Sequence, residues 1–112
     1  DFERDGDDLY HRHPISFPKA VFGSTVEVPT VTGAAELEVP EGTQSGEEFR
    51  LRGQGMPHLR GRGHGDLYVQ VQVVTPDSLN QEQRDALEAF AAAGGEDVDV
   101  SEGFFEKIKN SF

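Results

Sequence analysis

The histidines and glycines of this chain are spaced in ways that could support metal binding or phosphate binding. His11 and His13 lie two positions apart, which places both on one face of a strand, and imidazole is a common ligand of zinc and nickel. The chain has four histidines, but it has no cysteine and no well-spaced carboxylates to complete a ligand set. We therefore expect no metal site and no cofactor in this chain.

The glycines at 53–55 and 61–65, GQG and GRGHG, superficially resemble a phosphate-binding loop. Such a loop needs a lysine followed by serine or threonine at the start of a helix, whereas a strand pattern follows here. We expect these glycines to supply positive φ angles in a tight connection. The chain also has no G-x-S-x-G motif and no thiol, so we expect no enzymatic activity.

Four of the ten basic residues lie close together around this loop: Arg50, Arg52, Arg60 and Arg62. They could contact RNA, but salt bridges to the abundant acids are the simpler expectation. The chain carries 21 acidic residues and a net charge of −11, which argues against nucleic acid or an anionic membrane as the main partner. This composition suggests adaptation to high salt; an ordinary acidic surface is the alternative.

The length of 112 residues suits a single domain, and we expect a fragment of a longer protein. No apolar run approaches the ~20 residues of a membrane-spanning helix. The lack of cysteine fits a cytoplasmic location.

Alternating apolar and polar residues predict several strands. Residues 9–17 form one such run, and because Pro14 cannot donate to a ladder, this strand should lie at an edge or contain a bulge. One helical turn is expected at 18–23. Residues 26–39 should form a hairpin that turns at Thr32-Gly33, and residues 49–52 and 67–73 two further half-buried strands.

The pattern becomes helical after Pro76. Asn80 and Gln83 make a capping box for a helix that should end at Gly94-Gly95. A last helix should present one apolar face, made of Phe104, Phe105, Ile108 and Phe112. A short isolated helix is marginal in water, so this face must be buried either against the domain's own sheet or against a second copy, which we favour.

Five segments together resemble a known family. Their sequences are FERDGDDLY (2–10), VPTVTG (28–33), VPEGTQSGEEFRLRGQGMP (39–57), GDLYVQVQVVTP (65–76) and LNQEQRDAL (79–87). In this order they are similar to the second C-terminal β-domain of a DnaJ-type J-domain co-chaperone, followed by its dimerisation tail.

The resemblance implies a mainly β fold, a two-layer β-sandwich with a short helix and C-terminal helices. It implies a client-binding β-domain at 1–76, a helix within 77–95, and a linker with a dimerisation helix at 96–112. It also implies a heat-shock and protein-folding role, with unfolded polypeptides, a second copy and a DnaK-type ATPase as partners. The J-domain, the zinc-binding cysteine modules and the first β-domain of the family have no counterpart in this sequence.

A client-binding surface needs apolar side chains beside an edge strand. Our candidate site residues are Leu9, Tyr10, Ile15, Phe17, Phe49 and Leu51. The two-residue period cannot say which set faces the core and which lines a groove. A purely structural dimerisation module, with clients bound on a preceding domain, is the main alternative. An RNA-binding β-domain that uses the arginine loop is a more distant one.

Overall fold

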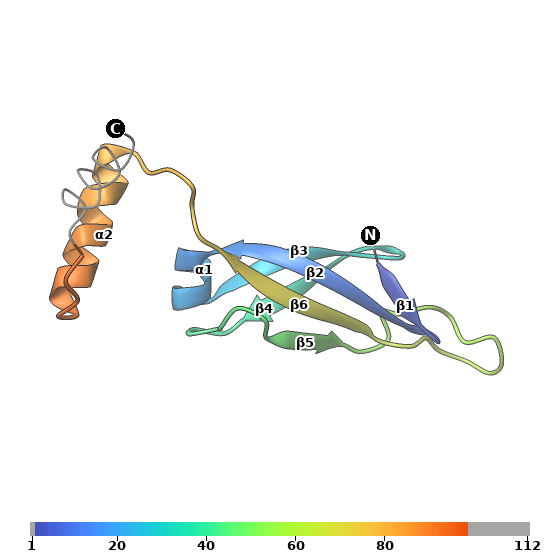
Figure 1. Cartoon of the computed structure of the whole chain (residues 1–112). Helices are drawn as coiled ribbons and strands as arrows, with labels where there is room; N and C mark the ends of the chain where they lie inside the picture. The colour runs from blue at the N-terminus through green and yellow to red at the C-terminus, as the bar shows by residue number, and fades with distance from the viewer. Residues whose placement is uncertain (1, 99–112) are drawn as a thin grey trace, which may run out of the picture. The chain divides into compact units, whose positions relative to one another are not determined.

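The computed structural model describes residues 2–98 (Figure 1). The chain divides into two units, Asp1–Thr75 and Pro76–Phe112. The described part of the first unit contains all six strands, in a mainly β fold with two layers, as the sequence predicted. The described part of the second unit contains one helix, α2 (Gln81–Ala93).

The larger sheet has four strands in the order β1-β2-β6-β5. These are β1 (Glu3–Asp5), β2 (Asp8–Ser16), β6 (Leu67–Val74) and β5 (Glu48–Leu51). β2 and β6 run parallel over eight residue pairs, from Leu9↔Leu67 to Ser16↔Val74, and they form the centre of the sheet. β1 and β5 pair antiparallel with β2 and β6 respectively.

The second layer is the predicted hairpin of β3 (Ser24–Thr30) and β4 (Gly33–Val39). Val26 and Leu37 are paired in register and both are buried. Alternate residues of β2 and β6 complete the core between the layers. Three side chains at the centre of that core, Leu67, Val69 and Val71, have no exposed surface.

The strand predicted at 9–17 differs from the observed one at its end. β2 stops at Ser16, and Phe17 is the first residue of α1 (Phe17–Phe22). The Ser16 side chain accepts a hydrogen bond from the Lys19 backbone N–H, and Pro18 occupies the first turn, where its missing N–H is not needed. Local capping therefore ends the strand one residue earlier than the alternation suggests.

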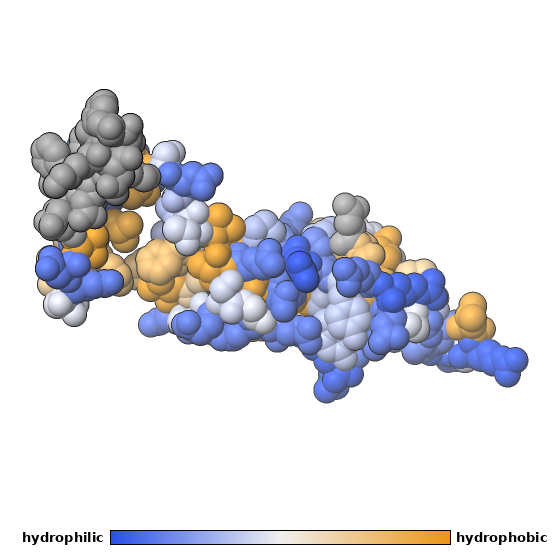
Figure 2. Space-filling view, viewed as in Figure 1, coloured by the Kyte–Doolittle hydropathy of each residue, from blue (hydrophilic) through white to orange (hydrophobic). Residues whose placement is uncertain are grey.

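The helix α2 begins at the predicted capping box. Asn80 accepts a hydrogen bond from the Gln83 N–H, and the Gln83 side chain accepts one from the Asn80 N–H. The helix ends at Gly94, whose N–H donates to carbonyls of the last turn. The expected dimerisation helix, with Phe104, Phe105, Ile108 and Phe112, lies outside the described residues. Figure 2 maps hydropathy over one face of the molecule.

Candidate functional site

The strand β2 has one side that is only partly paired. β6 pairs with β2 over its whole length from Leu9, whereas β1 pairs only with Asp8–Tyr10. The Leu9 N–H donates to the Asp66 carbonyl at 2.8 Å, so the odd-numbered residues of β2 direct their backbone groups to β6. The even-numbered residues direct theirs to the other side, where no strand within residues 2–98 pairs beyond Tyr10. We call the stretch 12–16 of this side the open edge.

Pro14 lies on this open edge. Its nitrogen points away from β6, so its lack of an N–H removes no hydrogen bond from the β2–β6 ladder. The expectation that the proline lies at an edge is therefore confirmed for this half of β2. The same geometry leaves the N–H groups of Arg12 and Ser16 and the carbonyls of Arg12 and Pro14 directed outward.

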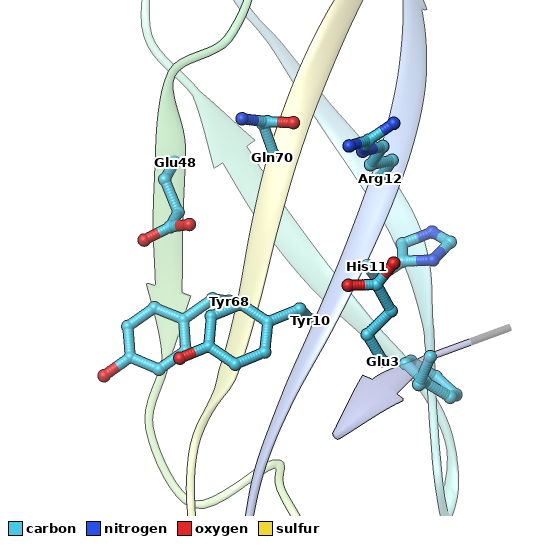
Figure 3. A pocket seen from close by; sticks show the side chains of 8 residues that line it. Glu3, Tyr10, His11, Arg12, Glu48, Tyr68 and Gln70 are labelled. Atoms are coloured by element: carbon cyan, nitrogen blue, oxygen red, sulfur yellow. The ribbon is translucent and has the colours of Figure 1, made fainter. Parts of the chain in front are cut away.

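A shallow groove crosses the outer face of the four-stranded sheet and continues around the start of the open edge to Phe2 and His11. Its lining consists of Phe2, which precedes β1, and of seven residues from β1, β2, β5 and β6: Glu3, Tyr10, His11, Arg12, Glu48, Tyr68 and Gln70. Figure 3 shows Tyr10 and Tyr68 side by side, with Gln70 between Arg12 and Glu48. This order follows from the register, because Gln70 pairs with Arg12 on one side and with Glu48 on the other.

The two tyrosines form an aromatic platform in this groove. Their rings stack with centroids 5.1 Å apart and an interplanar angle of 15°. Partial desolvation raises the pKa of Tyr10, and the nearby carboxylates of Asp5 and Asp8 raise it further. The hydroxyl of Tyr10 therefore stays protonated at neutral pH, and the stacked rings offer an apolar face with polar hydroxyls at its rim.

Two histidines of β2 lie on the opposite side of the strand, toward the second layer. The ring nitrogens of His11 and His13 are 3.4 Å apart, and the Phe2 ring packs on His11 with a centroid distance of 5.7 Å. Burial lowers the pKa of both histidines below its ordinary value. They are therefore mainly neutral at pH 7, and the inner side of the open edge presents weakly polar rings.

The six residues predicted to bind clients fall into three positions. Leu9 and Ile15 are buried in the core. The structure thus shows which face of β2 points to the core, a question that the alternation of residues could not answer. Phe49 and Leu51 are half-buried and pack against the core from β5. Tyr10 lines the groove, and Phe17 is 39% exposed at the far end of β2.

Among the lining residues of the groove, only Tyr10 was predicted as a site residue. The others were not: Phe2, Glu3, His11, Arg12, Glu48, Tyr68 and Gln70. Alternation places His11 and Arg12 on opposite faces of β2, but it does not reveal that β1 begins opposite Tyr10 or that Phe2 packs on His11. The expected salt bridges of the arginine loop are found at Arg50, whose guanidinium lies 2.6 Å from the Asp66 carboxylate. This arginine and the Gly53 N–H lower the pKa of Asp66.

Residues 2–98 contain no group of three or more metal-ligating side chains that could hold an ion. Among the described residues, no helix is both long enough and apolar enough to cross a membrane.

Two family models match the chain. The DnaJ C terminal domain matches residues 1–76, and the Chaperone protein DnaJ C-terminal region matches residues 82–112. Two relatives from halophilic archaea, each named Chaperone protein DnaJ, share 77% identity (Natronomonas pharaonis) and 76% identity (Haloquadratum walsbyi) with 99% and 100% of this chain. A protein of the same name from Enterococcus faecalis is 53% identical over 99% of the chain.

The chain spans 29% of the length of each of these relatives. The identities to proteins of halophilic archaea agree with the high-salt adaptation that the acidic composition suggested. From both family models and from these identities over nearly its whole length, the chain belongs to the DnaJ family and comprises its C-terminal domain and C-terminal region.

Proposed function

We propose that this chain is the client-binding and dimerisation part of a DnaJ-type co-chaperone, which acts in the cytoplasm together with a DnaK-type ATPase and catalyses no reaction itself. Family membership and relatives named as chaperones support this role. The clients are unfolded or partly folded polypeptides. The DnaK-type partner is engaged through the longer protein.

The open edge of β2 is the observation that carries the client-binding proposal. An extended polypeptide can add to this edge as a further strand, because outward N–H groups at Arg12 and Ser16 alternate with outward carbonyls. Main-chain hydrogen bonds are independent of the client's sequence. Such binding suits a protein that must accept many different unfolded chains.

Side chains on both sides of the open edge give the added strand its apolar contacts. A bound strand would direct alternate side chains to the two faces of the sheet. On the outer face they would approach Tyr10, and on the inner face they would approach His11 and His13. Leu9 and Ile15 would hold β2 in place from the core, with Phe49 and Leu51 packed beside them and Phe17 at the end of the site.

A pair of substitutions at one position tests whether the backbone of the open edge binds clients. Arg12→Pro removes an outward N–H without removing a bond to β6, and Arg12→Gln removes the guanidinium but keeps the N–H. We expect Arg12→Pro to weaken binding of a labelled extended apolar peptide about tenfold, the effect of one or two lost hydrogen bonds. We expect Arg12→Gln to bind within about twofold of the unsubstituted chain.

Fluorescence anisotropy measures the peptide affinity, and suppression of aggregation of a denatured protein measures client binding. Circular dichroism shows whether each variant is folded. Equal binding by the Arg12→Pro and Arg12→Gln variants would contradict strand addition at this edge. If the intact chain neither binds peptide nor suppresses aggregation, the structural dimerisation module becomes the better function. Salt-sensitive RNA binding would instead favour the RNA-binding alternative.

Dimerisation would increase the strength of client binding. Two weak sites in one dimer can engage the same unfolded chain, and the second contact is then intramolecular, with a gain in avidity of ~10²-fold or more. The apolar face of Phe104, Phe105, Ile108 and Phe112 is the proposed dimer contact. The match of residues 82–112 to the DnaJ C-terminal region supports this assignment.

A further inference from the structure

The connection between β5 and β6 is an ordered hairpin that extends beyond the strands, at the right of Figure 1. Its two arms are joined by hydrogen bonds from the Gly55 N–H to the Gly65 carbonyl and from the Gly65 N–H to the Met56 carbonyl, both 2.9 Å. A third bond, of 3.0 Å, joins the His58 N–H to the Gly63 carbonyl. Residues 59–62 therefore form the tip of a paired hairpin.

The base of this hairpin is fixed to the turn between β1 and β2. The Met56 N–H donates to the Asp7 carbonyl at 2.8 Å, and His58 Nδ1 lies 2.8 Å from Asp7 Oδ2. Gly65 packs so closely on Asp7 that a Cβ atom at this position would lie 2.2 Å from the Asp7 carbonyl oxygen. The stem of the hairpin is thus held in a defined position, which limits the conformational freedom that the tip would lose on binding a partner.

The tip combines an apolar side chain with two cationic ones. Leu59 is 93% exposed, the highest value of any large apolar side chain described. Arg60 and Arg62 are also exposed, and among residues 2–98 neither has an ion-pair partner, in contrast to Arg50. The tip at the right of Figure 2 accordingly shows apolar and strongly hydrophilic side chains together.

We propose that this tip, Leu59 with Arg60 and Arg62, is a docking point for an acidic segment of another polypeptide that carries an apolar side chain. Charge complementarity supports this docking point. The chain has a net charge of −11, yet these two arginines have no counter-charge among residues 2–98. Guanidinium groups bind carboxylates in a bidentate manner, so such contacts depend on short-range geometry. Leu59 would enter an apolar environment on the partner.

Two other occupants fit the tip less well. Nucleic acid would meet two free arginines but also the acidic surface of the rest of the chain, which repels phosphate. A second copy of this chain could supply carboxylates, and a shallow recess lined by Phe22, Glu38, Val39 and Glu41 joins them to apolar side chains. The net charge of −11 on each copy opposes that encounter. The docking surface is separate from the open edge of β2, so its existence does not depend on the proposed client site.

A binding assay with defined probes tests the proposal on the intact chain. The probe is a short glutamate-rich peptide that contains one leucine and carries an uncharged dye. Two comparison peptides differ from it: one has glutamine in place of glutamate, and the other has serine in place of leucine. We expect the acidic leucine peptide to bind best. Arg60→Gln combined with Arg62→Gln should weaken its binding about tenfold or more, and Leu59→Ser about threefold or more.

Matched controls come from elsewhere in the chain. Arg84→Gln removes a cation from α2, and Val31→Ser removes a 44% exposed apolar side chain from the β3–β4 turn. Both controls should bind the acidic peptide within about twofold of the unsubstituted chain, and all variants should retain its circular dichroism spectrum. Equal losses in controls and tip variants would overturn the proposal, because net charge alone would then explain the binding.

Three further results would overturn it. One is equal affinity for the glutamate and glutamine peptides. Another is a tip-dependent preference for a labelled oligonucleotide over the acidic peptide, which would make the tip a nucleic-acid contact. The third is a combined result: the unsubstituted chain does not bind the acidic peptide, and the tip substitutions lower the molar mass measured in solution. The tip would then be a contact between copies of the chain.

Discussion

The side chains of Asp7 and His58, 51 positions apart in the sequence, meet with 2.8 Å between Oδ2 and Nδ1. This contact joins the turn that starts β2 to the hairpin that precedes β6. The two central strands are thereby fastened at one end of the sheet by side chains as well as by their ladder. The strand that carries the open edge and the hairpin that carries the tip both begin near this junction.

The contact should make the stability of the fold depend on pH. The hydrogen bond from His58 is the largest cause of a pKa of Asp7 below its ordinary value of 3.8. A carboxyl with a lowered pKa contributes stability above its unfolded-state pKa, and this contribution is lost as the pH falls through the folded-state pKa. Asp7→Asn should therefore lower the urea midpoint at neutral pH, and the difference should shrink as the pH falls below the ordinary carboxyl pKa of 3.8.

Urea unfolding of the Asp7→Asn variant at a series of pH values measures this effect. Asp77→Asn, an exposed carboxyl in the segment after β6, is the charge-matched control and should leave the midpoint unchanged. A difference between Asp7→Asn and the unsubstituted chain that stays constant over the whole pH range would contradict the assignment.

Gly65 should be intolerant of any side chain. A Cβ atom there would lie 2.2 Å from the Asp7 carbonyl oxygen and 2.8 Å from Asp8 Oδ1. Gly65→Ala must therefore displace backbone, and we expect it to lower the free energy of unfolding by about 2–4 kcal/mol. Gly94→Ala is the control, because the nearest atom to its Cβ would be 3.7 Å away, and it should change stability by less than about 1 kcal/mol.

Two leucines at the extremes of burial should respond very differently to truncation. Leu67 has no exposed surface, so Leu67→Ala should cost about 2–5 kcal/mol of unfolding free energy. Leu59 is 93% exposed, so Leu59→Ala should change that energy by less than about 0.5 kcal/mol. Denaturant unfolding measures both. A comparable loss in the two variants would mean that the hairpin tip is packed against the domain.

Glu27 and Glu36 are directly opposed on β3 and β4, and both are exposed. Opposed like charges destabilise a strand pair, and salt screens the repulsion. Glu36→Gln should raise stability at low salt by about 0.2–1 kcal/mol and reduce the gain that KCl produces. Thermal unfolding at low and molar KCl measures this change. An unsubstituted chain with equal stability at both salt concentrations would argue against high-salt adaptation.

The proposed dimer predicts a concentration-dependent molar mass in solution. Phe105→Ala and Ile108→Ala should each shift the chain toward monomer, because truncating a buried apolar side chain at an interface weakens association. Phe22→Ala, which truncates a 78% exposed phenylalanine of α1, should not. Light scattering at several protein concentrations and at high salt provides the masses. A monomer under all these conditions would remove dimerisation from the function proposed for this chain.

The local features of the fold could be predicted because short-range rules govern them. The β3–β4 hairpin follows from alternation around Thr32-Gly33, and the start of α2 follows from the Asn80 capping box. The position of Pro14 at an edge follows from its missing N–H. The family resemblance also came from residue order alone and is confirmed by the family models.

The features that depend on distant pairing could not be predicted. A two-residue period shows that Leu9 and Tyr10 face opposite ways, but it does not say which of them is buried, nor that β2 lies parallel to a strand about 58 positions later. Likewise, the sequence predicts salt bridges for the arginine-rich loop, but it does not reveal that Arg50 is the paired arginine or that Leu59 is exposed at a tip.

The sequence by itself therefore determined the caps, the family and every described element except the short strand β1, since these depend on neighbouring residues. Only the tertiary structure decided the register of β2 on β6, the open edge beyond Tyr10 and the Asp7–His58 contact. The physical reason is that strand pairing and side-chain contacts are made between segments distant in the chain, whose meeting is fixed by packing of the whole core rather than by any local pattern.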